Sequence, residues 1–365
     1  MVFILVSLVI FIGTIYIFIQ QPKFGKIPKS SKLELIKQSP HFKNGKFENL
    51  TPTPDLTEGV SYYAVMKEFL FEKSKRGKPA AILPSVKINL QQLNKDENVL
   101  VWFGHSSYFM QVDGKKFLID PVLSGAASPV RFTTKSFKGS DVYTTDDIPS
   151  IDYLVITHDH WDHLDYETIT KLKSKVSKVI CGLGVGIHFE CWGYESSRIS
   201  ELQWYETIQL NNGFTIHSNP ARHFSGRGFS RNKSLWMSYV LQTPRMKIFI
   251  GGDSGYDSHF KKIGIEHGPF DLAILECGQY DKSWRYIHTL PGEIIKVIQD
   301  LRAKKVMPVH WGKFQLANHA WDEPIINISR FAEENNFSLV TPLIGEAVHL
   351  KREDQLFLQW WKEIN

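Results

Sequence analysis

The sequence has few cysteines and little net charge. Its 365 residues include three cysteines and carry a formal net charge of +5 at pH 7. Cys181, Cys191 and Cys277 are odd in number and none stands in a Cys-x-x-Cys spacing, so neither a disulfide framework nor a cysteine zinc site is indicated, and a reducing compartment is expected. A charge of +5 is too small to indicate a nucleic-acid partner. The hydrophobic content of 42% is that of a folded protein.

Charged residues are absent from one long stretch at the N-terminus. Residues 2–19 form a nearly continuous apolar run, which as a helix rising ~1.5 Å per residue would cross most of a bilayer core. No basic residue precedes the run, which argues against a cleaved signal peptide. Four lysines follow it: Lys23, Lys26, Lys29 and Lys32. The positive-inside rule then predicts that the rest of the chain lies on the cytoplasmic face, with these lysines either at anionic headgroups or in a solvated linker.

The densest group of metal-binding residue types lies in nine consecutive positions. The segment Thr157-His158-Asp159-His160-Trp161-Asp162-His163-Leu164-Asp165 follows the apolar run from Ile151 to Ile156. Neutral imidazole and carboxylate oxygen suit Zn²⁺, so we expect His158 and His160 to face one divalent ion, and Asp162 and His163 to face a second. A solvated loop that caps the next helix is the alternative, but a cap needs one such residue.

Three further predicted strands each end at another candidate ligand. The strand 214–218 leads through Pro220-Ala221-Arg222 to His223, the strand 246–252 ends at Asp253, and the strand 305–309 ends at His310. Taken singly, each histidine would more often be structural, and Asp253 after two glycines would more often form a turn. Taken together with residues 157–165, they predict a binuclear metal site.

These residues resemble the zinc-ligand set of the metallo-β-lactamase superfamily. A narrower resemblance, to the N-acyl-phosphatidylethanolamine-hydrolysing phospholipases D, runs from about Val99 to about Glu346. It is carried by Trp102-Phe103-Gly104-His105-Ser106, Asp120-Pro121, Ala127-Ser128-Pro129, Pro220-Ala221-Arg222-His223, Gly252-Asp253-Ser254-Gly255-Tyr256, Gly268-Pro269-Phe270-Asp271-Leu272-Ala273, Tyr286-x-His288 and His310-Trp311-Gly312-x-Phe314-x-Leu316-Ala317-Asn318. The resemblance implies an α/β fold of the metallo-β-lactamase type, an αββα sandwich, here preceded by an N-terminal transmembrane or membrane-anchor helix.

The resemblance also implies a set of residue roles. It implies two Zn²⁺ ions, one held by His158, His160 and His223, the other by Asp162, His163 and His310, with Asp253 bridging them and a shared water acidified towards hydroxide as the nucleophile. Asp253 and His288 are the expected catalytic residues, and His288 and Trp161 are expected to contact substrate. A structural histidine at a helix entry is the alternative for His288. His105 and Asp120 are expected to orient ligand side chains rather than to bind metal.

The implied function is a zinc-dependent phosphodiesterase of the phospholipase D type. It would hydrolyse N-acyl-phosphatidylethanolamine-like phospholipids to phosphatidic acid and N-acylethanolamine, with a phospholipid substrate and a membrane as partners and no nucleic acid. A homodimer is one candidate assembly. Because the superfamily fold hosts many reactions, two alternatives stay open: a metal-dependent lactonase or other soluble-ester hydrolase, and a membrane-anchored protein with a structural zinc site.

The predicted organisation has three parts: a membrane-anchor helix over 1–20, a linker and collar over 21–98, and a catalytic domain over 99–365. In the last part, strands are expected at 99–103, 108–112 and 116–119, and helices at 166–173, 292–302 and 324–334. In the collar, Tyr62, Tyr63, Met66, Phe69 and Leu70 fall at helical spacing, as in a helix that grips lipid or one that packs into a core. The aromatic residues near the motifs could equally line an acyl-chain entry or pack in the core: Trp161, Phe224, Trp284 and Trp311.

Overall fold

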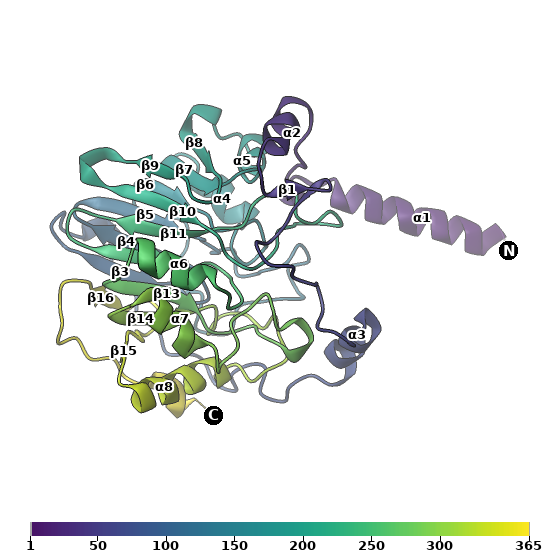
Figure 1. Ribbon diagram of the computed structural model, residues 1–365. Coiled ribbons are helices and arrows are strands. Elements are labelled where there is room, and N and C mark those ends of the chain that lie inside the picture. Colours follow the sequence, from purple (N-terminus) through teal and green to yellow (C-terminus); the bar gives the residue numbers. More distant parts are fainter. Residues whose placement is uncertain (1, 365) are drawn as a thin grey trace.

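Two mixed β-sheets form the body of the protein in the computed structural model, which describes residues 2–364 (Figure 1). The first sheet has the order β16-β3-β4-β5-β6-β7-β8, with bounds Ala347–His349, Val99–Trp102, Tyr108–Val112, Lys115–Ile119, Ile151–Val155, Val176–Gly182 and Ile199–Leu202. The second has the order β15-β14-β13-β12-β11-β10-β9, with bounds Ser338–Leu339, Lys305–Val309, Leu272–Glu276, Lys247–Ile250, Ser238–Gln242, Thr215–Asn219 and Thr207–Gln209. In each sheet, parallel pairing over the strands from β5 to β8 and from β12 to β15 is joined to antiparallel pairing over the rest.

Helices cover the outer faces of the two sheets. The helices α4 (Tyr166–Leu172) and α5 (Gly186–Cys191) cover the first sheet, and α6 (His259–Glu266), α7 (Ile294–Leu301) and α8 (Glu323–Asn335) cover the second. Side chains alternate along each strand. In β3, Leu100 and Trp102 face the core between the sheets, whereas Val101, and Phe103 directly after the strand, face the core under α4 and α5. The predicted α/β sandwich is confirmed, and the predicted strands and helices lie within two residues of the observed ones at each end.

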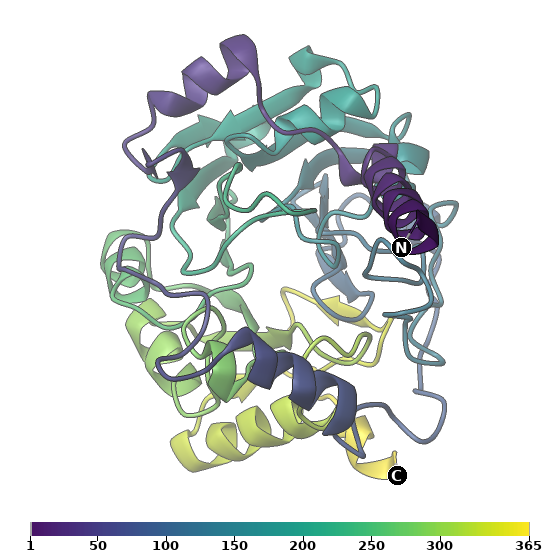
Figure 2. The same ribbon diagram turned by 90° about the vertical axis from the view of Figure 1, so that its right-hand side faces the viewer.

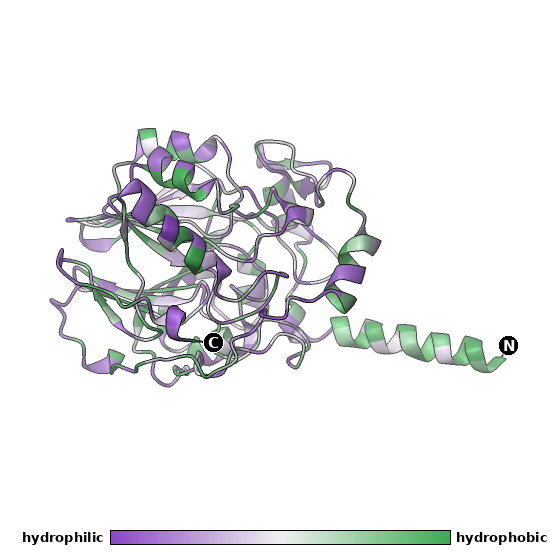
Figure 3. Ribbon diagram, turned by 90° about the horizontal axis from the view of Figure 1, so that it is seen from below, coloured by the Kyte–Doolittle hydropathy of each residue, from purple (hydrophilic) through white to green (hydrophobic). Residues whose placement is uncertain are grey.

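The N-terminal helix α1 (Val2–Ile19) extends away from this body (Figure 1). None of its residues is buried, and Figure 3 shows it as apolar along its length. By length and composition it could cross a membrane, a property that a signal sequence near an N-terminus shares.

The collar wraps the body as short elements rather than as an unstructured linker. It contains η1 (Pro22–Phe24), α2 (Ser30–Lys37), β1 (Phe42–Lys43), β2 (Lys46–Phe47), α3 (Tyr62–Phe71) and η2 (Leu90–Gln92). Four more 3-10 turns follow in the catalytic part: η3 (Ser196–Arg198), η4 (Asn211–Gly213), η5 (Lys282–Trp284) and η6 (Trp360–Glu363).

The helix α3 presents its apolar side chains to solvent. Ser61 caps it by accepting a hydrogen bond from the backbone nitrogen of Ala64 at 3.1 Å. No residue of α3 is buried, and Tyr63 and Phe71 are 72% and 78% exposed. The core-packing interpretation of this stripe is therefore wrong. Figures 1 and 2 place α3 and α1 on the same side of the molecule.

Candidate metal centre

Ligand-type side chains from both sheets meet at one edge of the sandwich. The loop after β6 carries His158, His160, Asp162 and His163 from the first sheet. His223, Asp253 and His310 follow β10, β12 and β14 of the second sheet. His160 is half-buried and the other six are buried. The structure thus brings all seven predicted metal ligands into one cluster.

Three histidines form the first group of this cluster, which we call the three-histidine group: His158, His160 and His223. The Nδ1 atom of His160 lies 2.9 Å from Nε2 of His158 and 3.2 Å from Nε2 of His223. On the opposite side of its ring, Nδ1 of His223 donates to the carbonyl oxygen of Ile287 at 2.8 Å. This bond fixes the ring so that Nε2 faces the other two histidines.

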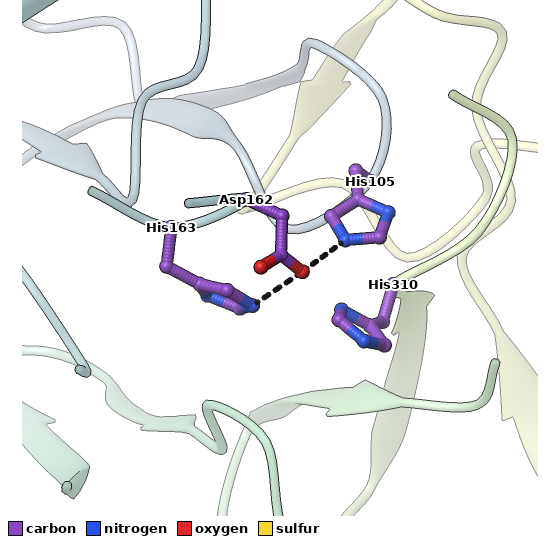
Figure 4. A group of neighbouring side chains, drawn as sticks. All are labelled: His105, Asp162, His163 and His310. Atoms are coloured by element: carbon purple, nitrogen blue, oxygen red, sulfur yellow. Dashed lines mark hydrogen bonds and ion pairs between the residues drawn. The ribbon is translucent and has the colours of Figure 1, made fainter. Parts of the chain in front are cut away.

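Asp162, His163 and His310 form the second group, which we call the mixed group (Figure 4). Nε2 of His163 lies 3.4 Å from Oδ2 of Asp162. Asp253 lies between the two groups: its Oδ2 is 3.2 Å from Nε2 of His163 and 3.7 Å from Nε2 of His223, and its Oδ1 is 3.3 Å from Nδ1 of His310. Asp253 is therefore placed where a bridging carboxylate would be needed.

Most of the ligand-type side chains have the protonation state that binds a cation. His163 is the exception, because burial opposes its charge but Asp253 and Asp162 outweigh this and raise its pKa well above the usual value, so it must release a proton when a metal binds. Burial lowers the pKa of His158, His223 and His310 well below the usual value, and that of His160 to about 4, so these imidazoles are neutral at pH 7. Burial alone would raise the pKa of Asp253, but the surrounding histidines, His163 first, outweigh it and lower that pKa. Neutral imidazole and ionised carboxylate are the forms that bind metals.

The spacing and the unpaired atoms fit divalent ions as well. Ligand atoms ~2.0–2.1 Å from a tetrahedral metal are roughly 3.3 Å apart, close to the separations of 2.9 and 3.2 Å within the three-histidine group. Nε2 of His163 and Oδ1 of Asp253 are buried and have no hydrogen-bond partner among residues 2–364. Such orphaned buried atoms need an explanation, and one or two divalent ions held by the seven side chains supply it.

The two predicted orienting residues contact ligands of the mixed group. Oδ2 of Asp120 accepts a hydrogen bond from Nδ1 of His163 at 2.8 Å, and Nε2 of His105 lies 2.9 Å from Oδ2 of Asp162. His105, Asp120 and His310 all have a positive φ, at 53°, 42° and 68°. Non-glycine residues rarely adopt this conformation, and it clusters at functional sites. His105 also offers a ring nitrogen within 4.8 Å of the ligand-type atoms of the mixed group.

His288 lies beside the cluster and is held by a residue that the sequence analysis missed. Its Nδ1 is 2.5 Å from Oε2 of Glu276, the last residue of β13. Burial opposes a charge on His288, but Glu276 outweighs this and raises the pKa of His288. Glu276 is fixed in turn, because its Oε1 accepts from the backbone nitrogens of Ser254 and Thr289 at 3.1 and 2.8 Å. The signal was available, because β13 ends in a polar residue and the polar residues Asp253 and His310 follow its neighbours β12 and β14.

Asp159, in the middle of the histidine-rich loop, serves the loop rather than the metal groups. Its carboxylate accepts from the backbone nitrogen of Gly226 at 2.6 Å, from Oγ of Ser234 at 2.7 Å and from Nε2 of His188 at 3.2 Å. Arg227 donates to its carbonyl oxygen at 2.9 Å. The loop is thereby fixed from the side facing away from the ligands.

A cavity of about 270 Å³ opens onto the cluster. Its polar lining includes Arg231 and Gln279 besides the metal-ligand types, and its apolar lining consists of Leu56, Phe224, Trp284, Ile287 and Leu316. The collar contributes Asp55, Leu56 and Tyr62. Phe224, Trp284 and His288 thus lie where a substrate would contact them.

Two of the aromatic residues that the sequence singled out lie elsewhere. Trp311 is 1% exposed and packs in the core, so it does not line an entry. The ring of Trp161 is 5.2 Å from that of Phe24 and 4.0 Å below the guanidinium of Arg227. Trp161 is not among the residues that line the cavity.

Comparisons with known proteins agree with this geometry. A family model described as a Beta-lactamase superfamily domain matches residues 115–311. An uncharacterized protein of Mycobacterium tuberculosis is 35% identical over 329 residues, 89% of this chain and 88% of that protein. N-acyl-phosphatidylethanolamine-hydrolyzing phospholipase D 1 of Caenorhabditis elegans is 31% identical over 291 residues, 75% of this chain and 81% of that protein. Among solved structures, a metallo hydrolase of Ignicoccus hospitalis has a TM-score of 0.53 at 20% identity, covering 69% of this chain and 97% of that one.

Proposed function

The chain belongs to the metallo-β-lactamase superfamily and is a metal-dependent hydrolase, and we propose that its substrate is an N-acyl-phosphatidylethanolamine-like phospholipid. The products are phosphatidic acid and an N-acylethanolamine. The similarity to the C. elegans enzyme, which spans 81% of that protein, supports this substrate class.

The observation that carries the proposal is the composition and position of the cavity. One cavity joins the metal-ligand side chains to His288, to the cationic Arg231 and to an apolar wall that includes Leu56 and Trp284. A phospholipid offers the matching parts, a phosphate beside apolar chains. The cavity is also lined by Tyr62, the first residue of α3, whose exposed apolar side chains lie on the side of the molecule from which α1 extends (Figures 1 and 2).

The side chains of the cavity have distinct tasks in this reaction. Arg231 is positioned by Asp55, whose Oδ2 is 2.9 Å from its guanidinium nitrogen NH1, and it lies 3.8 Å over the ring of Phe224. There it attracts the phosphate into the cavity. His288 has its Nδ1 engaged by Glu276, so its Nε2 is the ring nitrogen left for the substrate. We assign to this atom a hydrogen bond to a phosphoryl oxygen.

The reaction is hydrolysis of one phosphodiester bond. The oxygen of a water molecule forms a bond to phosphorus, the bond from phosphorus to the N-acylethanolamine oxygen breaks, and that leaving oxygen takes up a proton. We propose that the two groups hold two Zn²⁺ ions, with His158, His160 and His223 at one, Asp162, His163 and His310 at the other, and Asp253 at both. When bound, zinc polarises a phosphoryl oxygen and lowers the pKa of water.

The proposal includes a location and partners. We propose that the apolar α1 anchors the protein in a membrane with the catalytic domain on the cytoplasmic face. The lysines that follow α1 support this orientation through the positive-inside rule. The partners are the membrane and its phospholipids, with no role for nucleic acid, and a homodimer remains one arrangement to test. The collar acts as part of the site, because Asp55, Leu56 and Tyr62 belong to the cavity lining.

Mass spectrometry of reaction products tests the substrate directly. The full-length protein in detergent is incubated with an N-acyl-phosphatidylethanolamine, and we expect phosphatidic acid and N-acylethanolamine to appear in equal amounts. Asp253→Asn should reduce the rate by at least about a hundredfold, because it removes a charge from both groups. His288→Gln should reduce the rate by about tenfold or more, since its contact strengthens at the charged transition state.

A matched control is Asp271→Asn, which removes a carboxylate beside Lys304 at the start of β13 and should leave the rate unchanged. Turnover of water-soluble lactones or esters without turnover of the phospholipid would replace the proposal with a soluble-ester hydrolase. Full activity of Asp253→Asn would leave the metal with a structural role only.

A further inference from the structure

A second cavity lies at the foot of α1. Its volume is about 630 Å³, and it is lined by the end of α1, by the segment 24–29 and by residues of the loops at 159, 184–188 and 226–234. It shares no lining residue with the cavity of the metal centre. Nothing in the proposed reaction uses it.

The lining of this foot cavity is strongly cationic. Lys26, Lys29, Lys233 and Arg227 line it, and its one carboxylate is Asp159. That carboxylate already accepts the three hydrogen bonds from Gly226, Ser234 and His188. Lys26 and Lys29 are exposed and have no ion-pair partner within 4.0 Å in the described part of the chain. The cavity therefore has an excess of positive charge that an anion would neutralise.

The foot cavity is lined by apolar side chains as well. Ile19, Ile27 and Phe229 belong to the lining, and Phe229 is 82% exposed. A small soluble anion has no apolar part that could pack against these side chains. A phosphate attached to a glycerol and acyl chains matches both the lysines and the apolar side chains.

The position along α1 gives the depth at which the foot cavity lies. Ile19 is the last residue of α1, and Ile19 and Gln20 both line the cavity. A helix of this length that crosses a bilayer ends where the hydrocarbon core meets the headgroups. Lys26 and Lys29 follow Ile19 closely in the chain and line the same cavity, so they lie near the level of lipid phosphates.

The segment after α1 is bound to the body, so the foot cavity is preformed. The indole nitrogen of Trp192 donates to the carbonyl oxygen of Pro22 at 2.8 Å. Arg227 donates to the carbonyl oxygen of Lys23 at 2.9 and 3.2 Å, and the backbone nitrogen of Lys26 donates to Nδ1 of His188 at 3.2 Å. A preformed site binds without the entropic cost of ordering a loop.

From these observations we propose that the foot cavity binds the phosphate headgroup of an anionic membrane lipid. The ligand class is a lipid phosphodiester with net negative charge, held by Lys26 and Lys29. Lys233 and Arg227 contribute their positive charge, because their donors already bond to backbone carbonyl oxygens. The inference rests on α1 lying in a bilayer, and it is independent of the bond that the metal centre cleaves. Free phosphate shares the headgroup chemistry, so the experiment separates the two sources.

Native mass spectrometry of the full-length protein in dodecyl maltoside measures which lipids it retains. Phosphatidylglycerol and phosphatidylcholine with identical acyl chains are offered in equal amounts. We expect retention of phosphatidylglycerol to exceed that of phosphatidylcholine. Lys26→Gln/Lys29→Gln should lower this preference by about tenfold or more, because each lysine at an anionic headgroup contributes about fivefold in affinity. Ser230→Trp, which fills the foot cavity without changing charge, should lower the retention of phosphatidylglycerol as well.

The control is Lys261→Gln/Lys262→Gln, which changes the net charge equally on the exposed face of α6, remote from this cavity. An equal loss of preference in this control would overturn the proposal, because total charge would then explain the retention. Unchanged retention in both foot-cavity variants would also overturn it. Calorimetric titrations compare sn-glycerol 3-phosphate and inorganic phosphate with phosphatidylglycerol. If the two soluble anions bind as tightly as the lipid, the proposal that the ligand comes from the membrane is overturned.

Discussion

The carboxylate of Asp120 sets the tautomer of His163, so replacing Asp120 by asparagine should weaken metal binding. Oδ1 of Asp120 accepts from the backbone nitrogen of Thr157 at 2.8 Å, while Oδ2 accepts from Oγ1 of Thr157 at 2.6 Å and from Nδ1 of His163 at 2.8 Å. With the proton on Nδ1, the lone pair of His163 lies on Nε2, the atom that faces Asp162 and Asp253.

An asparagine would keep its oxygen on the Thr157 nitrogen and turn its amide group towards His163. Nδ1 of His163 would then have to accept, and the proton would move to Nε2, the nitrogen that a metal needs. Loss of such an orienting partner costs roughly 10–100-fold in metal affinity, which is about 1.4–2.8 kcal/mol. The dissociation constant for Zn²⁺, measured by competition with a chelator, should rise by that factor.

The matched control is Asp152→Asn on β6, which removes a carboxylate that pairs with Lys115 at 2.9 Å on the surface of the same sheet. It should leave zinc affinity unchanged. Thermal unfolding of both metal-free variants separates a tautomer effect from a general loss of fold. Zinc affinity of Asp120→Asn equal to that of the unaltered protein would refute the assignment of Nε2 of His163 as a ligand atom.

Three further outcomes are expected. Gly264→Ala should lower the free energy of unfolding by more than about 2 kcal/mol in urea titrations, because a Cβ there would lie 1.8 Å from the carbonyl oxygen of Asp300, whereas Gly292→Ala, with no atom within 4 Å, should change little. Burial lowers the pKa of His259 to about 3, so as the pH falls below about 6.5 this histidine takes up a proton in the unfolded chain but not in the folded one, and it should remove about 2 kcal/mol of stability between pH 7 and pH 5. Urea titrations of His259→Gln should therefore show a pH dependence of the unfolding free energy that is smaller by that amount. A pH dependence equal to that of the unaltered protein would contradict the burial argument. Removal of metal with a chelator should abolish hydrolysis and lower the melting temperature, and added Zn²⁺ should restore both.

The grouping of the candidate metal ligands was predictable because these residues follow a simple rule of sheet geometry. Apolar strands of one sheet end at a common edge, and polar residues that follow these ends are candidates for a functional site. His223, Asp253 and His310 were found in this way, each after a strand recognisable from its pattern. Glu276 obeys the same rule at the end of β13 and was missed, because a lone carboxylate at a strand end has no motif around it.

The collar was not predictable, because its structure depends on contacts with distant residues. The apolar stripe of α3 has the same spacing as a core helix, and only the fold shows that its side chains are exposed. The helix is held through polar links instead: Nδ2 of Asn318 donates to the carbonyl oxygen of Glu72 at 2.9 Å, and its Oδ1 accepts from the backbone nitrogen of Ser74 at 2.7 Å. Such long-range bonds leave no periodic signal in the sequence.

The segment that follows α1 is bonded to the same loop that supplies four of the seven candidate metal ligands. Arg227 donates both to the carbonyl oxygen of Lys23 and to that of Asp159, which stands between His158 and His160. Phe24 packs against Trp161 of that loop. These bonds leave little freedom between the end of α1 and the candidate metal centre. In the proposed membrane location, α1 would therefore also fix how the cavity faces the bilayer. An anchor joined by a flexible linker would hold the enzyme near a bilayer, whereas α1 as the proposed anchor would also hold it in one orientation.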